Sequence, residues 1–556
     1  MSVLETRFDQ LFPVFDRVQM ETARRFANGE PRHFAPGEMI YDVGVRNTPV
    51  WLVLDGGLEI MRRDGLHRQT SVLLLTAGQF SGEIATLSGR GTVAAGRASP
   101  DGCTALPFDA PHIRALVVGS AELGEMIMRA YILRRVALIQ EGGAGSLLID
   151  RAGSPDLVRL QGFLSRNGYP HTVLDAATDD DARAAIERFG VTSDELPLMI
   201  CPNGALLKRP SEAEAGMCLG MTPVLDPKTV YDVAVVGAGP AGLAAAVYAA
   251  SEGLSVLVLD QRAFGGQAGA SARIENYLGF PTGISGQALA GRAFTQAQKF
   301  GAEIAIPLQV TRLDCRGARG REPFRLEIAN GGAVTARAVV VASGARYRRP
   351  DIPNLSDFDG NGVSYWVSPI EAKLCEGEEV ALIGGGNSAG QAVVFLAPRV
   401  KHLHLIVRGK GLEATMSRYL IDRIAALPNV TLHAGTEVVA LDGDRSAGLS
   451  KAVFRQRADG TTKDVPLRHL FLFIGADPNA GWLDGCVVED AKGFVVTGAG
   501  FTTKDVARAP LPLETSMPGV FAIGDVRANS TKRVGAAIGE GAAVVAQIHQ
   551  VLAQAN

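Results

Sequence analysis

The sequence predicts an α/β protein with two doubly wound parallel sheets, preceded by a β-roll and by a small α/β unit. From Tyr231 onward, apolar strand patterns alternate with helix patterns and contain two glycine-rich turns. Residues 146–222 carry a shorter strand–helix alternation, and residues 1–141 combine β-type runs with flanking helix patterns. The length agrees with this division, because 556 residues correspond to about three to five domains.

Composition excludes several classes of protein. Hydrophobic residues make up 47% and charged residues 20% of the chain, as in ordinary globular proteins rather than disordered ones. A net charge of −3 argues against a nucleic-acid-binding surface, which needs a basic face. The apolar stretch 233–250 is interrupted by GAGPAG, so we expect a buried strand–turn–helix and no membrane span. The N-terminus lacks the layout of a signal peptide, and we expect a cytoplasmic protein.

The six cysteines are few and scattered. They form no C-x-x-C motif and no zinc-ligand spacing, so we expect no metal site. This pattern suits a reducing compartment and predicts that the chain has no dithiol pair. The cysteines are Cys103, Cys201, Cys218, Cys315, Cys375 and Cys486.

Residues 1–141 are expected to form the β-roll. The runs 34–37, 51–56 and 80–85 resemble a cyclic-nucleotide-binding domain, and the last of them resembles its phosphate-binding cassette. The resemblance implies a pocket at Gly82, Glu83 and Thr92, with Glu83 on the ribose. The family places an arginine against the cyclic phosphate where this chain has Thr92, so a phosphate would lose a charge-assisted partner. The unit could therefore bind a cyclic nucleotide, or be a degenerate domain used for contacts.

Residues 146–222 are similar to a thioredoxin- or glutaredoxin-like fold. Leu196-Pro197 stands where that fold keeps its cis-proline, and the active-site position reads Gly153-Ser154-Pro155-Asp156. Serine replaces the leading cysteine and no C-x-x-C follows. We therefore predict a redox-silent docking or structural unit.

The first glycine-rich turn follows an apolar strand and opens a helix. In Gly237-Ala-Gly239-Pro-Ala-Gly242, the first glycine permits a tight turn, the second lets backbone approach a diphosphate, and the third allows close helix–strand contact. The helix directs free N–H groups at the phosphates. The next strand ends in Asp260, where a carboxylate would bind an adenosine ribose. Strand, glycines, helix and acid together predict a Rossmann-like dinucleotide site.

A second such turn contains Gly384, Gly386 and Ala389. The strand after it leads to Arg408 and Lys410 rather than to an acid. Positive charge at this place suits a 2′-phosphate and hence NADP rather than NAD. A solvated basic loop is the alternative.

Further motifs occur in a fixed order, among them 264–267, 274–277, 341–344, GGGNSA at 384–389 and GVFAIGDVR at 519–527. On these residues, about 228–556 resembles the thioredoxin-reductase branch of the flavin-dependent pyridine nucleotide-disulfide oxidoreductases. The resemblance implies a homodimer. It also implies an FAD domain of 228–345 and 488–556, with an NADP(H) domain of 346–487 inserted between them.

The same resemblance implies roles for single residues. Asp525 would hold the ribityl chain, Gln267 and Asn276 would line the flavin, and Arg533 and Val534 would lie at its pyrimidine end. A helix starting near Lys532 would stabilise negative charge on a reduced flavin. The expected FAD residues are Gly237, Gly239, Pro240, Ala241, Gly242, Asp260, Gly266, Gln267, Asn276, Gly344, Gly524, Asp525, Arg533 and Val534. The expected NADP(H) residues are Gly384, Gly386, Asn387, Ser388, Ala389, Arg408 and Lys410.

The family's Cys-Ala-Thr-Cys pair is missing. Trp366 and Pro369 occupy the two cysteine positions, and neither can attack a disulfide. Cys375 stands alone, and we expect ordinary packing there. The prediction is an FAD-dependent NADPH oxidoreductase that delivers electrons to oxygen, a quinone, a small disulfide or a partner protein. The alternatives are a thioredoxin-disulfide reductase that uses a partner's cysteines, and a non-catalytic flavin- and nucleotide-regulated redox sensor.

Overall fold

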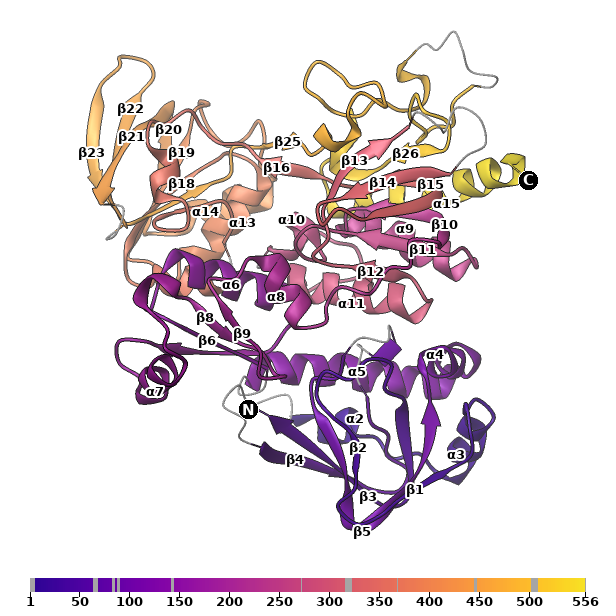
Figure 1. Ribbon diagram of the computed structural model, residues 1–556. Coiled ribbons are helices and arrows are strands. Elements are labelled where there is room, and N and C mark those ends of the chain that lie inside the picture. Colours follow the sequence, from indigo (N-terminus) through magenta and orange to yellow (C-terminus); the bar gives the residue numbers. More distant parts are fainter. Residues whose placement is uncertain are drawn as a thin grey trace.

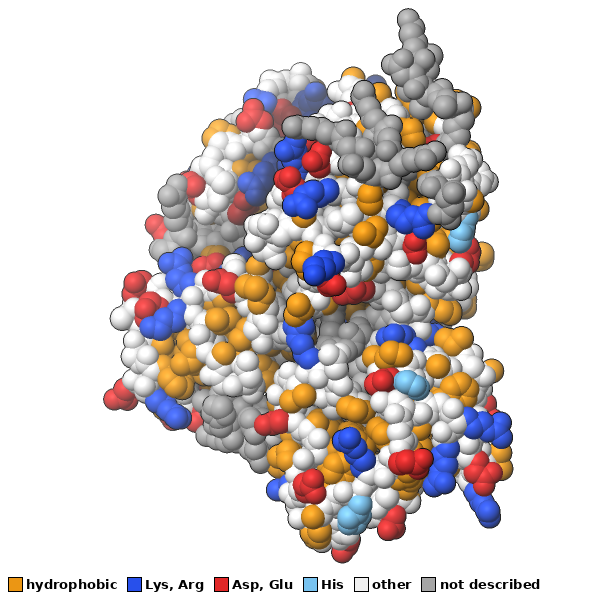
Figure 2. Space-filling model, turned by 45° about the vertical axis from the view of Figure 1, so that its right-hand side comes forward, with side chains coloured by type: hydrophobic (Ala, Val, Ile, Leu, Met, Phe, Trp, Pro, Cys, Tyr) orange, Lys and Arg blue, Asp and Glu red, His pale blue; other side chains and the backbone are white. Residues whose placement is uncertain are grey.

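The computed structural model describes residues 6–63, 69–82, 86–87, 91–141, 145–271, 273–315, 323–367, 369–444, 448–501 and 509–555. Its N-terminal part lies at the bottom of Figure 1, a small unit lies above and to the left of it, and two larger α/β parts form the top. Figure 2 shows basic, acidic and hydrophobic side chains interspersed on one face of the molecule.

An antiparallel sheet forms the N-terminal part. Its order is β1-β5-β3-β4, with β2 paired to β5, and short helices precede it while longer ones follow. Helix α5 lies between this sheet and the rest of the molecule (Figure 1). The elements are α2 (Phe8–Leu11), α3 (Arg17–Arg24), β1 (Arg32–Phe34), β2 (Met39–Tyr41), β3 (Val50–Arg63), β4 (Gln69–Leu75), β5 (Ala95–Phe108), α4 (Ala110–Gly119) and α5 (Ala121–Glu141).

The small unit has a four-stranded sheet of order β7-β6-β8-β9, in which β6 and β7 are parallel and β8 and β9 run antiparallel. The Leu196-Pro197 peptide bond directly before β8 is cis. Ser154 caps α6 by accepting the Leu157 N–H, and its hydroxyl donates to Asp150. The elements are β6 (Ser146–Asp150), α6 (Pro155–Arg166), β7 (His171–Asp175), α7 (Asp180–Phe189), η2 (Ser193–Glu195), β8 (Leu198–Ile200), β9 (Leu206–Lys208) and α8 (Glu212–Cys218).

A seven-stranded sheet carries the first glycine-rich turn. Strands β12, β11, β10, β15 and β26 are parallel, and β14 and β13 continue the sheet antiparallel. The central strands are apolar on both faces because hydrophobic clusters cover both. The elements are β10 (Val230–Val236), α9 (Pro240–Ser251), β11 (Val256–Leu259), α10 (Gly266–Gly269), α11 (Gly286–Lys299), β12 (Glu303–Ala305), β13 (Val310–Asp314), β14 (Phe324–Ile328), β15 (Ala333–Val341), η6 (Gly498–Gly500), β26 (Val520–Ala522), η7 (Gly524–Val526) and α15 (Val534–Ala555).

The second turn belongs to a parallel sheet of order β17-β24-β18-β19-β20. An antiparallel sheet of β21, β22 and β23 packs on it, and the pair β16–β25 connects it with the first sheet. The elements are β16 (Ala345–Tyr347), η4 (Leu355–Phe358), β17 (Val363–Ser364), α12 (Pro369–Leu374), β18 (Glu379–Ile383), α13 (Asn387–Leu396), β19 (His402–Val407), α14 (Arg418–Ala425), β20 (Val430–Ala434), β21 (Thr436–Asp444), β22 (Gly448–Gln456), β23 (Thr462–Pro466), β24 (His469–Leu472), β25 (Ala476–Pro478) and η5 (Gly481–Leu483).

Helix α15 is long and apolar enough to cross a membrane by length and composition alone. In this structure it packs along α9. A Cβ on Gly541 would stand 2.4 Å from the Ala241 carbonyl oxygen, and Val544, Val545 and Ile548 are buried in the same cluster as α9. The apolar side of α15 thus serves as part of a protein core.

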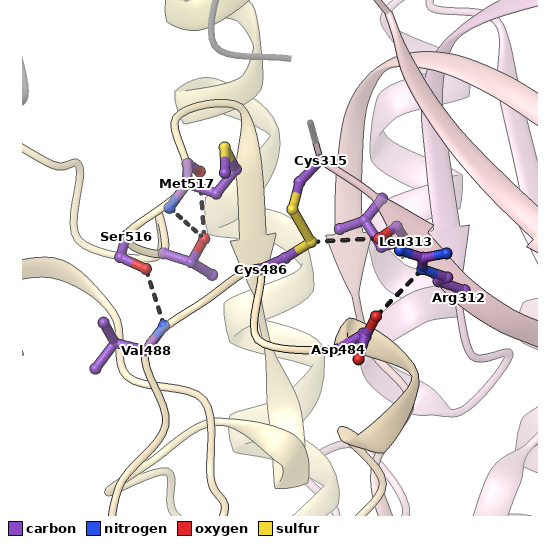
Figure 3. The surroundings of a disulfide bond; sticks show 9 residues. Arg312, Leu313, Cys315, Asp484, Cys486, Val488, Ser516 and Met517 are labelled. Atoms are coloured by element: carbon purple, nitrogen blue, oxygen red, sulfur yellow. Dashed lines mark hydrogen bonds and ion pairs between the residues drawn. A yellow bond between two sulfur atoms is a disulfide. The ribbon is translucent and has the colours of Figure 1, made fainter. Parts of the chain in front are cut away.

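Four cysteines form disulfide bonds, Cys201–Cys218 and Cys315–Cys486. The prediction of a chain without dithiol pairs is therefore wrong, and the cysteine argument for a reducing compartment loses its force. The paired cysteines are 17 and 171 residues apart, so no short motif could announce them. Figure 3 shows the second bond joining the end of β13 to the segment after η5, near the Arg312–Asp484 ion pair.

Candidate functional site

A cavity of about 740 Å³ lies where the first turn, the segment after β11, the start of α15 and the N-terminal part of α13 meet. Both α/β parts contribute to its wall, because β16 and β25 bring the second sheet beside the first. The predicted site residues on its lining are Gly237, Gly239, Pro240, Ala241, Asp260, Gly266, Gln267, Asn276, Gly344, Trp366, Asn387, Ser388, Gly524, Asp525, Arg533 and Val534.

The first turn has the shape that a diphosphate requires. Gly237 has φ +114°, and a Cβ on it would stand 2.2 Å from the Ala342 carbonyl oxygen. A Cβ on Gly242 would clash with Gly237 itself at 1.9 Å. A Cβ on Gly239 would meet only the Gly266 Cα at 3.9 Å, so it would fill the open cradle in front of α9. Helix α9 begins at Pro240, with its free N–H groups at this cradle.

Asp260 is the fixed acid beside this cradle. Its carboxylate accepts backbone N–H groups of Ala238, Arg262 and Ala263 at 2.8, 2.9 and 3.1 Å. Burial raises the pKa of Asp260, and these hydrogen bonds together with the nearby charge of Arg166 act against that rise. A carboxylate accepts about four hydrogen bonds, so one position is left for a hydroxyl in the cavity.

Asp525 and the start of α15 form the opposite end. The Gly524 N–H donates to Glu540 at 2.6 Å, which ties the loop to α15. Burial and Glu540 raise the pKa of Asp525, while Lys532 lowers it. Helix α15 begins at Val534, directly after Arg533, so a positive helix terminus and a cation face this end of the cavity.

The second turn is built like the first but lies mostly off this cavity. Gly384 has φ +154°, with a virtual Cβ 2.5 Å from the Phe473 carbonyl oxygen, and Gly386 has open space before α13. Ala389 is buried behind the turn. Arg408 and Lys410 follow β19 and are exposed.

A third cation joins these two, and no sequence motif marks it. Arg457 Nη1 donates to the Arg408 carbonyl at 3.2 Å, and its own N–H donates to Gly435. The nearby acid, Glu437, pairs with Arg455 at 2.6 Å and more distantly with Arg457 at 3.9 Å, and Arg455 is the main cause of its lowered pKa. Arg457 lies 49 residues from Arg408 and meets it through the fold, in which β19 pairs with β20 and β21 pairs with β22.

Trp366, which the sequence resemblance aligns with the first cysteine of the missing pair, lies on the cavity wall. Its Nε1 donates to buried Glu371 at 2.9 Å, and the Arg262 guanidinium lies 5.2 Å from the ring centroid. Pro369 begins α12. Among the described residues that line the cavity there is no cysteine. Cys375 is buried in a hydrophobic cluster, and burial raises its pKa to about 11, so it is a poor nucleophile.

Two of the residues expected in a cyclic-nucleotide pocket, Gly82 and Thr92, make hydrogen bonds within the N-terminal part. The Gly82 carbonyl accepts from Arg134 of α5 at 2.7 Å. The Thr92 hydroxyl donates to the Asp42 carbonyl at 2.6 Å, and its N–H donates to Val45. Glu83 lies outside the described residues. The pocket stays a prediction.

Known proteins match the two upper α/β parts, and one of them matches more of the chain. The family model "Pyridine nucleotide-disulphide oxidoreductase" matches residues 231–541. An alkyl hydroperoxide reductase subunit of Escherichia coli (strain K12) is 33% identical over 320 residues, 57% of each chain. The corresponding Pseudomonas aeruginosa protein is 31% identical over 396 residues, covering 70% of this chain and 72% of that one. Thioredoxin reductase of Treponema pallidum (strain Nichols) is 34% identical over 57% of this chain and 95% of its own.

Solved structures are similar to this chain over 58% of its length. The T. acidophilum thioredoxin reductase is 28% identical, with a TM-score of 0.51, over 58% of this chain and 98% of that one. The Lactococcus lactis enzyme, 24% identical with a TM-score of 0.52, covers 58% and 99% and agrees in fold. The chain spans less than three fifths of the length of the E. coli alkyl hydroperoxide reductase protein.

Proposed function

Because the chain belongs to the pyridine nucleotide-disulphide oxidoreductase family, we propose that it is an FAD-dependent NADPH oxidoreductase with no dithiol of its own beside the flavin. The observation that carries this proposal is the cavity itself. The first dinucleotide-type turn opens into it, the start of α13 after the second turn also lines it, and tryptophan stands where the resemblance sets the family's cysteine.

Bound at this cavity, FAD would supply two-electron chemistry between a nicotinamide and an acceptor. The first turn and Asp260 would hold its adenosine diphosphate half, and Asp525 with the start of α15 would hold the ribityl and flavin half. The helix terminus and Arg533 would favour negative charge at that end. The FAD domain would comprise 228–345 and 488–556, around an NADP(H) domain of 346–487.

Trp366 shapes the choice of acceptor in this proposal. Thiol–disulfide exchange needs a thiolate on the enzyme, and a tryptophan held by Glu371 and Arg262 supplies none, so electrons would leave the flavin without that exchange. Oxygen, a quinone, a small disulfide or a partner protein would receive electrons without a covalent enzyme intermediate. The relatives carry names as different as thioredoxin reductase and NADH dehydrogenase.

The N-terminal units would serve contact or regulation. We propose a degenerate cyclic-nucleotide-binding β-roll at 1–141 and a thioredoxin-like unit without C-x-x-C at 146–222. A cis-proline before β8 and the sheet order β7-β6-β8-β9 support the second assignment. We further propose a cytoplasmic homodimer.

Anaerobic rapid mixing of the flavin-loaded protein with NADPH tests the proposal. We expect fast loss of the flavin absorbance band, followed by reoxidation with oxygen or a quinone. Alkylating the reduced protein's thiols should leave turnover unchanged, and Cys375→Ser should behave as wild type. Turnover that alkylation abolishes would contradict the thiol-independent route. Flavin that NADPH fails to reduce would favour a non-catalytic sensor.

A further inference from the structure

The loop between β11 and α10 is held from outside by the small unit. The loop begins at Asp260 and leads into Gly266, the first residue of α10, and both residues flank the first cradle. The side-chain amide of Asn167 donates to the Arg262 carbonyl at 3.0 Å, and Arg166 Nη2 donates to the Gly266 carbonyl at 2.8 Å. The end of α6 therefore fixes the loop at both of its halves.

Neighbouring elements strengthen this contact. The Gln287 side chain of α11 donates to the Ser165 carbonyl at 2.6 Å. Arg135 of α5 donates to the Asn167 carbonyl at 2.6 Å, and its guanidinium lies 5.1 Å from the centre of the Phe264 ring in the loop. Helices from two N-terminal units thus converge where the loop meets α6.

Arg166 also reaches the cavity itself. It lines the wall together with Gly239, Asp260 and Gly266, and its charge acts on the pKa of the Asp260 carboxyl. A Cβ placed on Gly239 would stand 3.9 Å from the Gly266 Cα, so the cradle and the loop face each other here. The Arg166 guanidinium is therefore at the adenosine diphosphate end of the cavity.

Four other cations line the cavity in the described part of the chain, and their surroundings differ from those of Arg166; they are Arg262, Arg346, Lys532 and Arg533. Arg262 pairs with Glu212 at 3.2 Å and covers Trp366. Lys532 donates to the Asp525 carbonyl at 2.5 Å, at the opposite end. A diphosphate carries two negative charges, and the first turn supplies only N–H groups and a helix terminus to meet them. A guanidinium is the side chain best suited to such an anion.

We propose that Arg166 is a cofactor-binding residue, supplied by the small unit to the diphosphate of FAD held in the neighbouring domain. The inference rests on the proposed function, since it takes FAD as the ligand of the first turn. It gives the thioredoxin-like unit a role that needs no redox chemistry: the unit completes the flavin site. Docking of this unit and retention of FAD are then one event.

The test compares FAD affinity of Arg166→Gln with wild type, by titrating the flavin-free protein and following quenching of flavin fluorescence. Loss of a charge-assisted contact predicts an affinity about 10-fold or more lower, partly restored by Arg166→Lys. ADP has the diphosphate but lacks the flavin. Its affinity, measured by competition with FAD, should be lower for Arg166→Gln than for wild type by a factor similar to that for FAD. Raising the salt concentration should narrow the difference between Arg166→Gln and wild type.

Two matched variants separate cofactor binding from ordinary packing. Arg159→Gln removes a cation from the same helix, where it contacts Asp156 and the Pro210 carbonyl, and should leave FAD affinity unchanged. Gln287→Ala removes one hydrogen bond of the same interface without touching the cavity. Unchanged FAD affinity in Arg166→Gln would overturn the inference. Equal weakening in Gln287→Ala would also overturn it, by showing a purely structural contact. A wild-type protein that binds no FAD would instead refute the proposed function.

Discussion

The two glycine-rich turns of this chain are alike in backbone and differ in what surrounds them. Each has a first glycine at positive φ whose Cβ would strike a carbonyl oxygen, and a second glycine that faces open space before a helix. The first turn is flanked by Asp260, whose carboxylate accepts three backbone N–H groups, and the small unit donates a hydrogen bond to Gly266 beside it. The second is followed by the exposed cations Arg408 and Lys410 after the end of β19. In the proposed function the first turn holds a retained cofactor and the second an exchanging substrate, and the two turns differ in what covers them.

A side chain in either cradle should have the largest effect, and a different effect at each turn. Gly239→Val should yield a folded protein that lacks FAD and all NADPH oxidation, because the side chain occupies the space in front of α9. Gly386→Val should keep FAD while its reduction by NADPH slows by about 100-fold or more, through lost phosphate contacts. Flavin content and rapid-mixing kinetics measure both. A yellow Gly239→Val protein would contradict the assignment of the first turn.

The Cys315–Cys486 bond should stabilise the part of the molecule that carries the first turn, the seven-stranded sheet and its helices, more than the part that carries the second turn. It joins the end of β13 to the residues just before segment 488–556, which returns to the first sheet. The two cysteines are 171 residues apart in the chain. Replacing both cysteines with serine should lower the free energy of unfolding by about 3–5 kcal/mol, because the unfolded chain is no longer constrained. Urea unfolding followed by flavin fluorescence measures it. The Cys201→Ser/Cys218→Ser variant is the control, and an unchanged midpoint for the first variant would count against this role.

The cations beside the second turn test whether this turn binds NADPH rather than NADH. Arg408→Gln and Arg457→Gln should each raise KM for NADPH about tenfold while KM for NADH changes little, because only NADPH carries the 2′-phosphate. Arg455→Gln is the control, since Arg455 lies near the end of β22 and pairs with Glu437 at 2.6 Å, a closer contact than the 3.9 Å between Glu437 and Arg457. Equal losses for both nucleotides would remove the case for NADP.

Lowering the pH should reduce the free energy of unfolding of the part that carries the second turn before that of the part that carries the first turn. Burial, with His404 and Lys463, lowers the pKa of His433 on β20 to about 4 from an ordinary 6.5. The unfolded chain therefore takes up a proton below about pH 6.5 that the folded chain refuses until about pH 4, so stability falls across this range. With half the group screened by solvent, we expect about 1 kcal/mol between pH 6.5 and 4.5.

His433→Gln should flatten that pH dependence in urea unfolding experiments, followed by tryptophan fluorescence. His549→Gln, whose histidine pairs with Glu252 in the part that carries the first turn, is the control variant. An identical pH slope in His433→Gln and wild type would assign the acid sensitivity to other groups.

Local features of the site could be predicted because they depend on a few consecutive residues. Gly237, Gly239 and Gly242 announce a turn by spacing alone, and Asp260 follows from the length of one helix and one strand. Trp366 could be placed because the surrounding motifs fix the register of the missing cysteine pair. Arg166, Arg457 and both disulfides escaped prediction, since each acts on residues far away in the chain.

The sequence by itself determined the alternation of strands and helices, the two phosphate cradles and the absence of a C-x-x-C pair, because hydrophobic period, glycine conformation and thiol chemistry are local properties. Only the tertiary structure decided which turn is enclosed, which cations reach it and which cysteines meet. Those outcomes depend on the packing of separate units against one another. The end of α6 on the loop of Asp260 shows this most directly, because no pattern in either segment refers to the other.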